Sequence, residues 1–323
     1  ASSARPSTPM LTRAVLLLGL LTLAAAQPAA GSARRTHVAD LLKAGHFAQA
    51  KAALKAELQA LTGEADRTMR AEVLGELGEV YEQWNRHTEA IGAYEEATEL
   101  IEAAHGRTDP RFGIAADRLA DAHAHVGNRK MAVALYKELV QLMLDGPMGT
   151  THPGLRVTLG KLGTEALAAG DAQAAAKAYG RLLELARGDD TAPAAGARAD
   201  AHLQLARALS MPGKRDAATP KAFRTRLERA LSHAHKAAEG FTRLPDGDPM
   251  DVAYSTNGVA GVLEKLGRDD EAVSAMERAY ALTVDAKGSE ADPAAVRAKK
   301  NLDGLRSLAM RKLARAKNVK SEL

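Results

Sequence analysis

The sequence predicts an all-α fold, a right-handed α-solenoid of helix-turn-helix repeats with a C-terminal capping helix. Apolar residues make up 46% of the 323 residues but aromatic residues only 3%, so the core must be packed from Ala, Leu and Val. Alanine is the best helix former. No run of β-branched and aromatic residues alternates with period two, as a half-buried strand would require. The third observation is a repeated spacing of prolines.

The N-terminus carries a predicted targeting signal. Behind Arg13 lies an apolar stretch of 13 residues, AVLLLGLLTLAAA, at positions 14–26. It has the length of a signal-peptide core and falls short of the ~20 residues of a membrane span. Small residues at its end favour cleavage after Ala26. An uncleaved membrane anchor and a buried helix are the alternatives.

The predicted signal peptide also sets the bounds of the segments before and after it. The first methionine is Met10, so residues 1–9 are excluded from the fold, and residues 1–26 form an N-terminal extension with the signal peptide. Residues 27–35 are expected to be a linker. Four arginines and no acidic residue occur in the first 35 positions.

Prolines divide the body of the chain. They are Pro110, Pro153, Pro193, Pro249 and Pro293. Their separations of 43, 40, 56 and 44 residues indicate an internal repeat. Three of them follow aspartate, and Asp-Pro supplies an N-cap and a pre-set first helical residue. Each proline is therefore predicted to mark a helix start, with His152-Pro153 and Ala192-Pro193 filling the same slot with weaker caps.

Each period carries the pattern of a two-helix unit, in which small and large residues recur at fixed positions. In residues 74–100, LGELGEVYEQWNRHTEAIGAYEEATEL, they are Leu77, Gly78, Tyr81, Ala90, Tyr94 and Ala97. They recur as Leu119, Ala120, His123, Ala132, Tyr136 and Leu139, as Leu162, Gly163, Ala166, Ala175, Tyr179 and Leu182, and as Val259, Ala260, Leu263, Ala272, Met276 and Ala279. Small residues let two helices cross closely, and the large residue fills the gap to the next unit. This pattern resembles that of tetratricopeptide (TPR) repeats.

The long period and the Asp/His-Pro helix start resemble the kinesin-light-chain subclass of the TPR family. The clearest example is DPMDVAYSTNGVAGVLEKLGRDDEAVSAMERAYALT, residues 248–283. Members of that subclass often carry asparagines in the first helix of a repeat, where they hold an extended peptide in the groove. Only Asn257 and Asn301 stand in comparable places here. The resemblance therefore implies peptide binding for part of the groove.

These patterns predict the domain organisation. A TPR solenoid spans 36–293 with about six two-helix units. The unit 193–248 is irregular because it contains a Gly-, Pro- and Lys-rich insertion at 210–220, expected on the surface. A capping helix covers 294–317 and a tail follows at 318–323. The residues expected to face the preceding repeat are Val296, Leu302, Leu305, Leu308, Met310 and Leu313.

The C-terminus is basic and carries a second targeting pattern. Residues 294–323 contain nine Lys/Arg and two acidic residues, and the body of the chain is net acidic, which does not indicate nucleic-acid binding. A solvated final helix explains these charges, and docking to an acidic partner or an anionic membrane is the alternative.

The last four residues, KSEL, resemble the K-D-E-L retrieval signal. With the signal peptide they predict the endoplasmic-reticulum lumen, and a secreted or periplasmic location is the alternative.

The TPR resemblance also implies a candidate partner-binding groove. Its transferred positions are Glu72, Glu79, Glu82, Asp117, Asp121, Tyr254, Asn257 and Glu264, together with Gly75 and Gly261. The N-terminal half of this surface would be acidic. We therefore expect it to hold a basic or lysine-rich segment of a partner protein, since carboxylates attract such a chain and favour its register. A solvated acidic face is the alternative.

Candidate chemistry is sparse. The chain has no cysteine, which excludes disulfides and thiolate nucleophiles, and it has no zinc-protease, phosphate-loop or G-x-S-x-G motif. The pairs His123/His125 and His233/His235 are two residues apart and so point to different sides of a helix.

The sequence predicts no enzyme, no cofactor, no metal site and no stable membrane span. We predict a non-catalytic scaffold or co-chaperone-like adaptor of the secretory pathway. A secreted or periplasmic TPR subunit of a larger complex is the alternative, and the partner's identity and the oligomeric state stay open.

Overall fold

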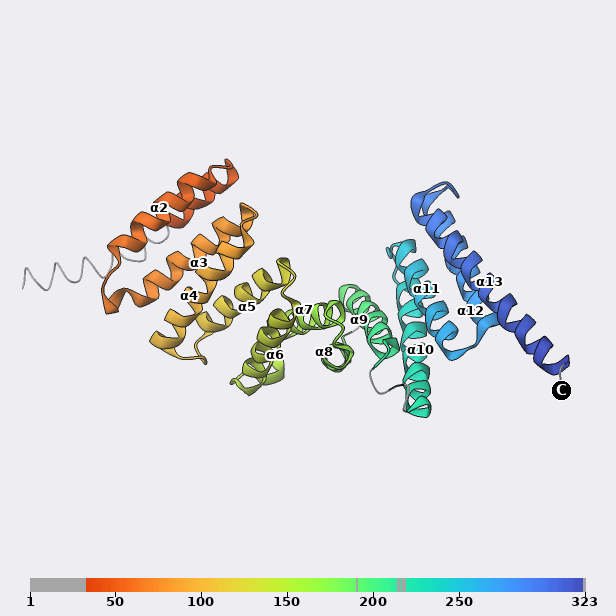
Figure 1. Ribbon diagram of the computed structural model, residues 1–323. Coiled ribbons are helices and arrows are strands. Elements are labelled where there is room, and N and C mark those ends of the chain that lie inside the picture. Colours follow the sequence, from red (N-terminus) through yellow and green to blue (C-terminus); the bar gives the residue numbers. More distant parts are fainter. Residues whose placement is uncertain (1–32, 190, 214–215, 217–218, 322–323) are drawn as a thin grey trace, which may run out of the picture. The chain divides into compact units, whose positions relative to one another are not determined.

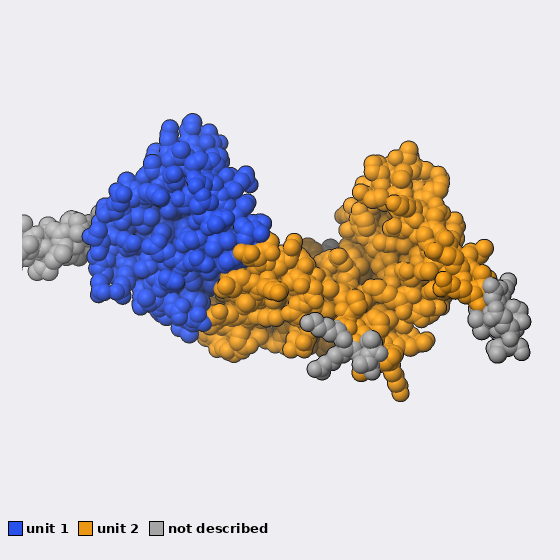
Figure 2. Space-filling model, in the orientation of Figure 1, with its two compact units in different colours: residues 1–126 blue, residues 127–323 orange. Residues whose placement is uncertain are grey.

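The computed structural model describes residues 33–189, 191–213, 216 and 219–321 of the chain. All regular structure in these residues is helical, which confirms the all-α prediction. The predicted signal peptide, residues 1–26, lies outside the described residues, as do the last two residues of the KSEL pattern. The chain divides into two compact units, residues 1–126 and 127–323, drawn in different colours in Figure 2.

Unit 1 is a row of antiparallel helices. Residues 33–43 are helical, and the elements that follow are α2 (Phe47–Ala60), the short 3-10 turn η1 (Glu64–Asp66), α3 (Arg67–Gln83), α4 (His87–His105) and α5 (Pro110–His125). From α2 to α5 each helix packs on the next one along the chain (Figure 1). Sequential packing of this kind is the arrangement of a repeat protein.

Unit 2 continues the same construction. Its elements are α6 (Arg129–Asp145), η2 (Gly149–Thr151), α7 (Leu155–Ala168), α8 (Ala172–Leu185), α9 (Ala192–Ser210), α10 (Pro220–Thr242), α11 (Pro249–Leu266), α12 (Asp269–Lys287) and α13 (Pro293–Ser321). Each helix again packs on its neighbour in sequence. The division between the units falls between α5 and α6, within the third predicted repeat.

The close helix crossings predicted from the repeat pattern are present in both units. A Cβ atom added to Gly78 of α3 would collide with the ring of Tyr94 of α4, and one added to Gly163 of α7 would lie 2.6 Å from the ring of Tyr179 of α8. Both tyrosines are buried. The glycines are therefore required by packing, because the ring of the second helix occupies the space that a side chain on the first would need.

The aspartates of the Asp-Pro pairs cap their helices as predicted. The carboxylate of Asp109 accepts from Arg111 N at 2.9 Å, that of Asp248 from Met250 N at 2.8 Å and that of Asp292 from Ala294 N at 2.7 Å. The two weaker sites differ. Helix α7 starts at Leu155, although His152 Nδ1 accepts from Gly154 N at 3.1 Å, and α9 starts at Ala192 after Thr191, with Pro193 as its second residue. The predicted starts there were wrong by one or two residues, as is usual at helix ends.

Two segments extend further as helix than the sequence predicts. The linker expected at 27–35 is already helical from residue 33, because Arg34 is anchored by carboxylates of α2 and α3. Helix α13 runs to Ser321 and not to 317, so the tail prediction was wrong for the part of it that the structure describes.

The contacts of α13 also differ in part from the expectation. Leu302 is buried in a cluster with Ala260, Met276 and Ala279, and Leu305 packs against it. The side chains of Val296, Met310 and Leu313 are exposed, contrary to prediction. Val296 and Met310 lie about 120° and 80° round the helix from Leu302. Leu313 follows Lys312, whose Nζ donates to Asp269, the first residue of α12, at 2.7 Å, so Leu313 lies near the end of the helix that α13 packs on.

Candidate interaction groove of unit 1

A groove of about 500 Å³ lies on unit 1 between the 33–43 helix, α3, α4 and α5. Its floor is apolar and includes Val38, Ala71, Ala97, Ile101 and Ala115, and all five are buried. Ile114 of α5 also lines the groove, with 58% of its surface exposed. An exposed branched side chain above a buried apolar floor is the kind of surface that a partner side chain can cover.

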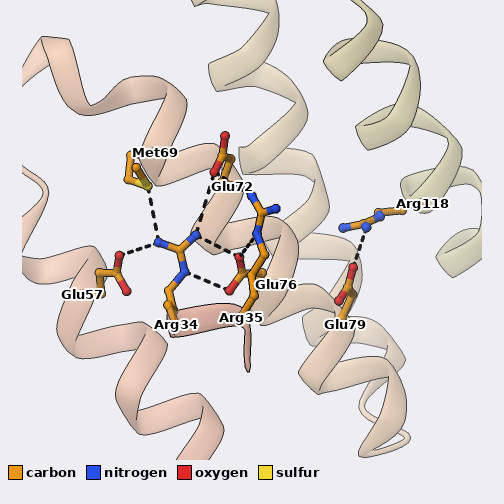
Figure 3. A network of polar contacts seen from close by, with 8 residues as sticks. All are labelled: Arg34, Arg35, Glu57, Met69, Glu72, Glu76, Glu79 and Arg118. Carbon is orange, nitrogen blue, oxygen red and sulfur yellow. Dashed lines mark hydrogen bonds and ion pairs between the residues drawn. The ribbon is translucent and has the colours of Figure 1, made fainter. Parts of the chain in front are cut away.

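The wall of the groove is held by Arg34 (Figure 3). Its side chain is only 9% exposed. The guanidinium donates to Glu57 of α2 at 2.6 Å and to both carboxylate oxygens of Glu76 of α3 at 2.9 and 3.0 Å. Burial lowers the pKa of Arg34, but the hydrogen bonds to Glu76 and Glu57 outweigh burial and raise it. Arg34 thus ties three helices together at the edge of the groove.

Arg35 lies on the rim and makes a different set of contacts. Its Nη2 donates to Glu72 Oε2 at 3.1 Å and its Nε to Glu76 Oε1 at 3.2 Å, so one guanidinium bridges two carboxylates (Figure 3). The side chain is 62% exposed. Ion pairs with this exposure contribute about 0.2–1 kcal/mol.

The opposite rim carries a second ion pair. Arg118 of α5 lies 2.5 Å from Glu79 of α3 (Figure 3). Burial raises the pKa of Glu79, and the nearby Arg118 opposes that rise. The predicted groove residues Glu72 and Glu79 therefore both line the groove, each with an arginine partner, and the surface is one of alternating charges rather than the bare acidic face that the sequence suggested.

Gly75 also lines the groove, whereas the other three acidic residues predicted in unit 1 lie outside the lining. Glu82 accepts a hydrogen bond from Tyr94 Oη at 3.0 Å. Burial, with that carboxylate beside it, raises the pKa of Tyr94. Asp117 and Asp121 are half-buried on α5, and neither is among the described residues that line the groove. The structure thus brings two of the five predicted acidic residues of unit 1 to one cavity.

In unit 2 the predicted positions share one face of α11. The side chains of Tyr254 and Asn257 are exposed and Glu264 is half-buried. At spacings of three and seven residues these three side chains follow one stripe of the helix. They stay a proposed contact surface of unit 2.

Sequence reasoning missed the arginines and the apolar residue of the groove. The repeat offset of 42 residues that maps Leu77 to Leu119 also maps Glu72 to Ile114 and Glu76 to Arg118. Applied to the predicted position Glu72, that offset would have found Ile114. Arg118 corresponds to Glu76, which was not among the predicted groove positions. Arg34 and Arg35 could not be found in this way, because they stand in a segment that the sequence assigned to a linker.

The groove can hold another molecule but offers no evident reaction chemistry. Among the described residues there is no group of three or more His, Asp or Glu side chains placed to hold a metal ion. No helix in the described part of the chain is long and apolar enough to cross a membrane. Glu72, Glu76 and Glu79, the carboxylates that line the groove, each form an ion pair with an arginine of the rim.

Two curated proteins are similar in sequence to this chain. The chain is 26% identical over 228 residues to the RxLR effector protein SFI4 of Phytophthora infestans, covering 71% of this chain and 63% of that protein. It is 25% identical over 252 residues to the secreted RxLR effector protein RXLR-C07 of Plasmopara halstedii, covering 78% and 72%. The chain thus spans less than two thirds of the length of the first of these relatives.

Solved structures and a family model give the fold and the family. A crystal structure of TPR-like repeats from a candidate kinesin light chain of Podosopora anserina superposes with a TM-score of 0.54 at 17% identity, covering 69% of this chain and 99% of that one. This likeness shows the TPR fold, and the kinesin-light-chain subclass stays a prediction. The model of a TPR-like family, described as soluble NSF attachment protein, matches residues 27–188, half of the sequence. The chain is therefore a TPR-type helical repeat protein and belongs to the soluble NSF attachment protein (SNAP) family.

Proposed function

We propose that the protein is a non-catalytic interaction scaffold that holds a segment of a partner protein in the groove of unit 1. The observation that carries this proposal is the combination of a 500 Å³ groove, a buried apolar floor and the exposed side chain of Ile114. Burial of apolar surface would supply the affinity. The ion pairs on the rim would fix the register of the bound segment.

The TPR-type fold supports a binding role over an enzymatic one. Each helix packs on its sequence neighbours, so the repeats present extended surfaces. The carboxylates that line the groove are paired with arginines that a bound segment can replace, so we expect these carboxylates to act in recognition. A basic segment remains the favoured partner, because the side chains of Glu72 and Glu79 stay 36% and 40% exposed beside Arg35 and Arg118.

We also infer that the protein enters the secretory pathway and is secreted. The predicted signal-peptide core at 14–26 and the similarity to a protein described as a secreted effector both support export. Lumenal retention through the KSEL pattern is the second candidate location. A fluorescent fusion with the tag placed before the final four residues, compared with the same fusion lacking them, separates the two. Equal secretion of both forms supports export, and retention of only the full form supports the lumen.

The groove is tested by Ile114→Arg, which places a charge over the apolar floor. Affinity capture from cells expressing the tagged protein, followed by quantitative mass spectrometry, should show loss of a partner that the unmodified chain retains. Val157→Arg is the matched control, because Val157 of α7 is similarly exposed (62%) and does not line the groove. Equal capture by both variants would contradict the assignment of this groove.

A further inference from the structure

Arg34 and Arg35 are consecutive in the sequence, yet their environments differ. Arg34 is 9% exposed and Arg35 is 62% exposed. Arg34 pairs with Glu57 of α2 as well as with Glu76, and it is absent from the groove lining. Arg35 lines the groove and pairs with Glu72 and Glu76 of α3. The first arginine holds helices together and the second lies on an open binding surface.

The Arg35 contacts can be replaced at low cost. The guanidinium is solvent-exposed, so its ion pairs contribute little to folding. Glu76 keeps its two hydrogen bonds from Arg34 if Arg35 moves away. Glu72 then keeps Arg34 Nη2 at 3.9 Å, which is too far for a hydrogen bond, and an electrostatic interaction with Arg111. Displacement of Arg35 therefore frees one carboxylate on the rim without disturbing the wall of the groove.

The geometry at this point fits a guanidinium. Two nitrogens of one planar group reach oxygens of two different carboxylates, at 3.1 and 3.2 Å. A lysine ammonium is a compact point charge and cannot present the same rigid fork. A second arginine, Arg118, pairs with a single carboxylate, that of Glu79, on the opposite rim. Both arginine contacts flank the apolar floor, so a matching segment would combine an arginine with apolar neighbours.

We propose that Arg35 is an internal competitor: it occupies the subsite on Glu72 and Glu76 that receives an arginine of the partner segment, and the partner displaces it. This inference rests on the proposed function of the groove and names the partner as a segment with an arginine beside apolar residues. The contact is autoinhibitory, because every binding event must first break the Arg35 ion pairs. Its cost is small enough to tune affinity without preventing binding.

The test is a peptide titration with the full chain. The probe is a fluorescein-labelled peptide of alanine and leucine with one central arginine, and the matched probe has glutamine in place of arginine. Arg35→Gln should bind the arginine peptide about two- to five-fold more tightly than the unmodified chain, as expected for removal of an exposed competing ion pair. The gain should shrink in high salt. Binding of the glutamine peptide should not change.

Two further variants make the test specific. Arg67→Gln removes an equal charge from an exposed pair with Glu64 at the start of α3, outside the groove, and should leave the affinity unchanged. Glu72→Gln in the Arg35→Gln background should abolish the gain. Because Arg34 is retained, circular dichroism and thermal unfolding of Arg35→Gln should match those of the unmodified chain, which excludes a folding artefact.

The outcomes separate this inference from the proposed function. Equal affinity of both chains for the arginine peptide, equal gains for both peptides, or no peptide binding at all would overturn the competitor role of Arg35. If Ile114→Arg still abolished partner capture, the groove would stand as the interaction site and only its ligand class would be wrong. If Ile114→Arg had no effect on capture, the proposed function itself would fail.

Discussion

The groove of unit 1 and the α9–α10 pair of unit 2 treat ionisable side chains in opposite ways. In unit 1 arginines and glutamates form ion pairs with one another around an apolar floor. In unit 2 His202 of α9 and His233 of α10 face each other with their Nδ1 atoms 2.8 Å apart. Burial lowers the pKa of His202 to about 4, helped by His233, Lys236 and Arg198. Burial also lowers that of His233, with Lys236 and Arg229.

The difference shows two ways in which a repeat protein of low aromatic content joins its helices. In a surface network of opposite charges, an internal ion pair can be replaced by an ion pair with a partner, because a charged group of the partner can take the place of a member of the network. A pair of neutral histidines has no such freedom, because one ring must donate and the other accept, and protonation of both would place two donors face to face. Recognition is therefore expected in unit 1, and pH sensitivity in unit 2.

Removal of Arg34 should cause the largest loss of stability among the changes that test this difference between the units. Arg34→Gln leaves Glu76, whose side chain is 12% exposed, without its bidentate partner. Breaking a buried ion pair costs about 3–5 kcal/mol, and the partial exposure of Glu57 places the expected loss near the lower end, about 3 kcal/mol. Trp84, the only tryptophan, lies in unit 1, so its fluorescence during urea unfolding reports this loss locally. A shift smaller than that of Arg67→Gln would contradict the anchoring role of Arg34.

Both units contain a close helix crossing in which a glycine faces a tyrosine ring. Gly78→Ala and Gly163→Ala each place a methyl group against a tyrosine ring of the next helix. Overpacking costs about 1–3 kcal/mol, which exceeds the gain of up to ~1 kcal/mol from Ala in a helix interior. Both variants should lower the melting temperature measured by circular dichroism. Gly92→Ala, where an added Cβ meets no atom within 4 Å, is the control and should raise it. Destabilisation by all three would mean that the tyrosine contacts are not the cause.

Acidification should produce a smaller effect that is confined to unit 2. The folded pKa values of His202 and His233 lie below the unfolded value of about 6.5. The unfolded chain therefore binds more protons between pH 6.5 and about 4, and stability is lost as the pH falls through this window. The melting temperature should drop by a few degrees from pH 7 to pH 5.

The signal of Trp84 separates the two units in this experiment. Between pH 7 and pH 5 its fluorescence transition should shift less than the circular dichroism transition, because the histidine pair lies in unit 2. His202→Gln removes one titrating ring and should flatten the pH dependence of the circular dichroism signal. A pH dependence that the substitution leaves unchanged would assign the effect to other groups.

The fold was predictable because its determinants are local and repeated. Small residues such as Gly78 and large ones such as Tyr94 recur from repeat to repeat and fix contacts between neighbouring helices, and the Asp-Pro pairs cap the helices that they begin. The groove was predictable only in part. Glu72 and Glu79 follow from the repeat, but Arg34 precedes the first recognisable unit and gains its role only through Glu57 and Glu76, 23 and 42 residues away.

The histidine pair escaped prediction for a related reason. His202 and His233 are 31 residues apart, on either side of the insertion in the irregular unit. Sequence reasoning compared only histidines two residues apart, which point to different sides of a helix. Contacts that depend on the register of two helices joined by a non-standard loop cannot be obtained from the repeat period.

The central claim, that the groove of unit 1 receives a partner segment, is tested most directly by site-specific photocrosslinking. A photoreactive benzoylphenylalanine at position 114 in place of Ile114 lies over the apolar floor, and the same group in place of Val157 is the matched control. The account predicts a crosslinked partner from position 114, competed by the arginine peptide, and none from position 157. Crosslinking that is equal from both positions, or that occurs only from position 157, would contradict it.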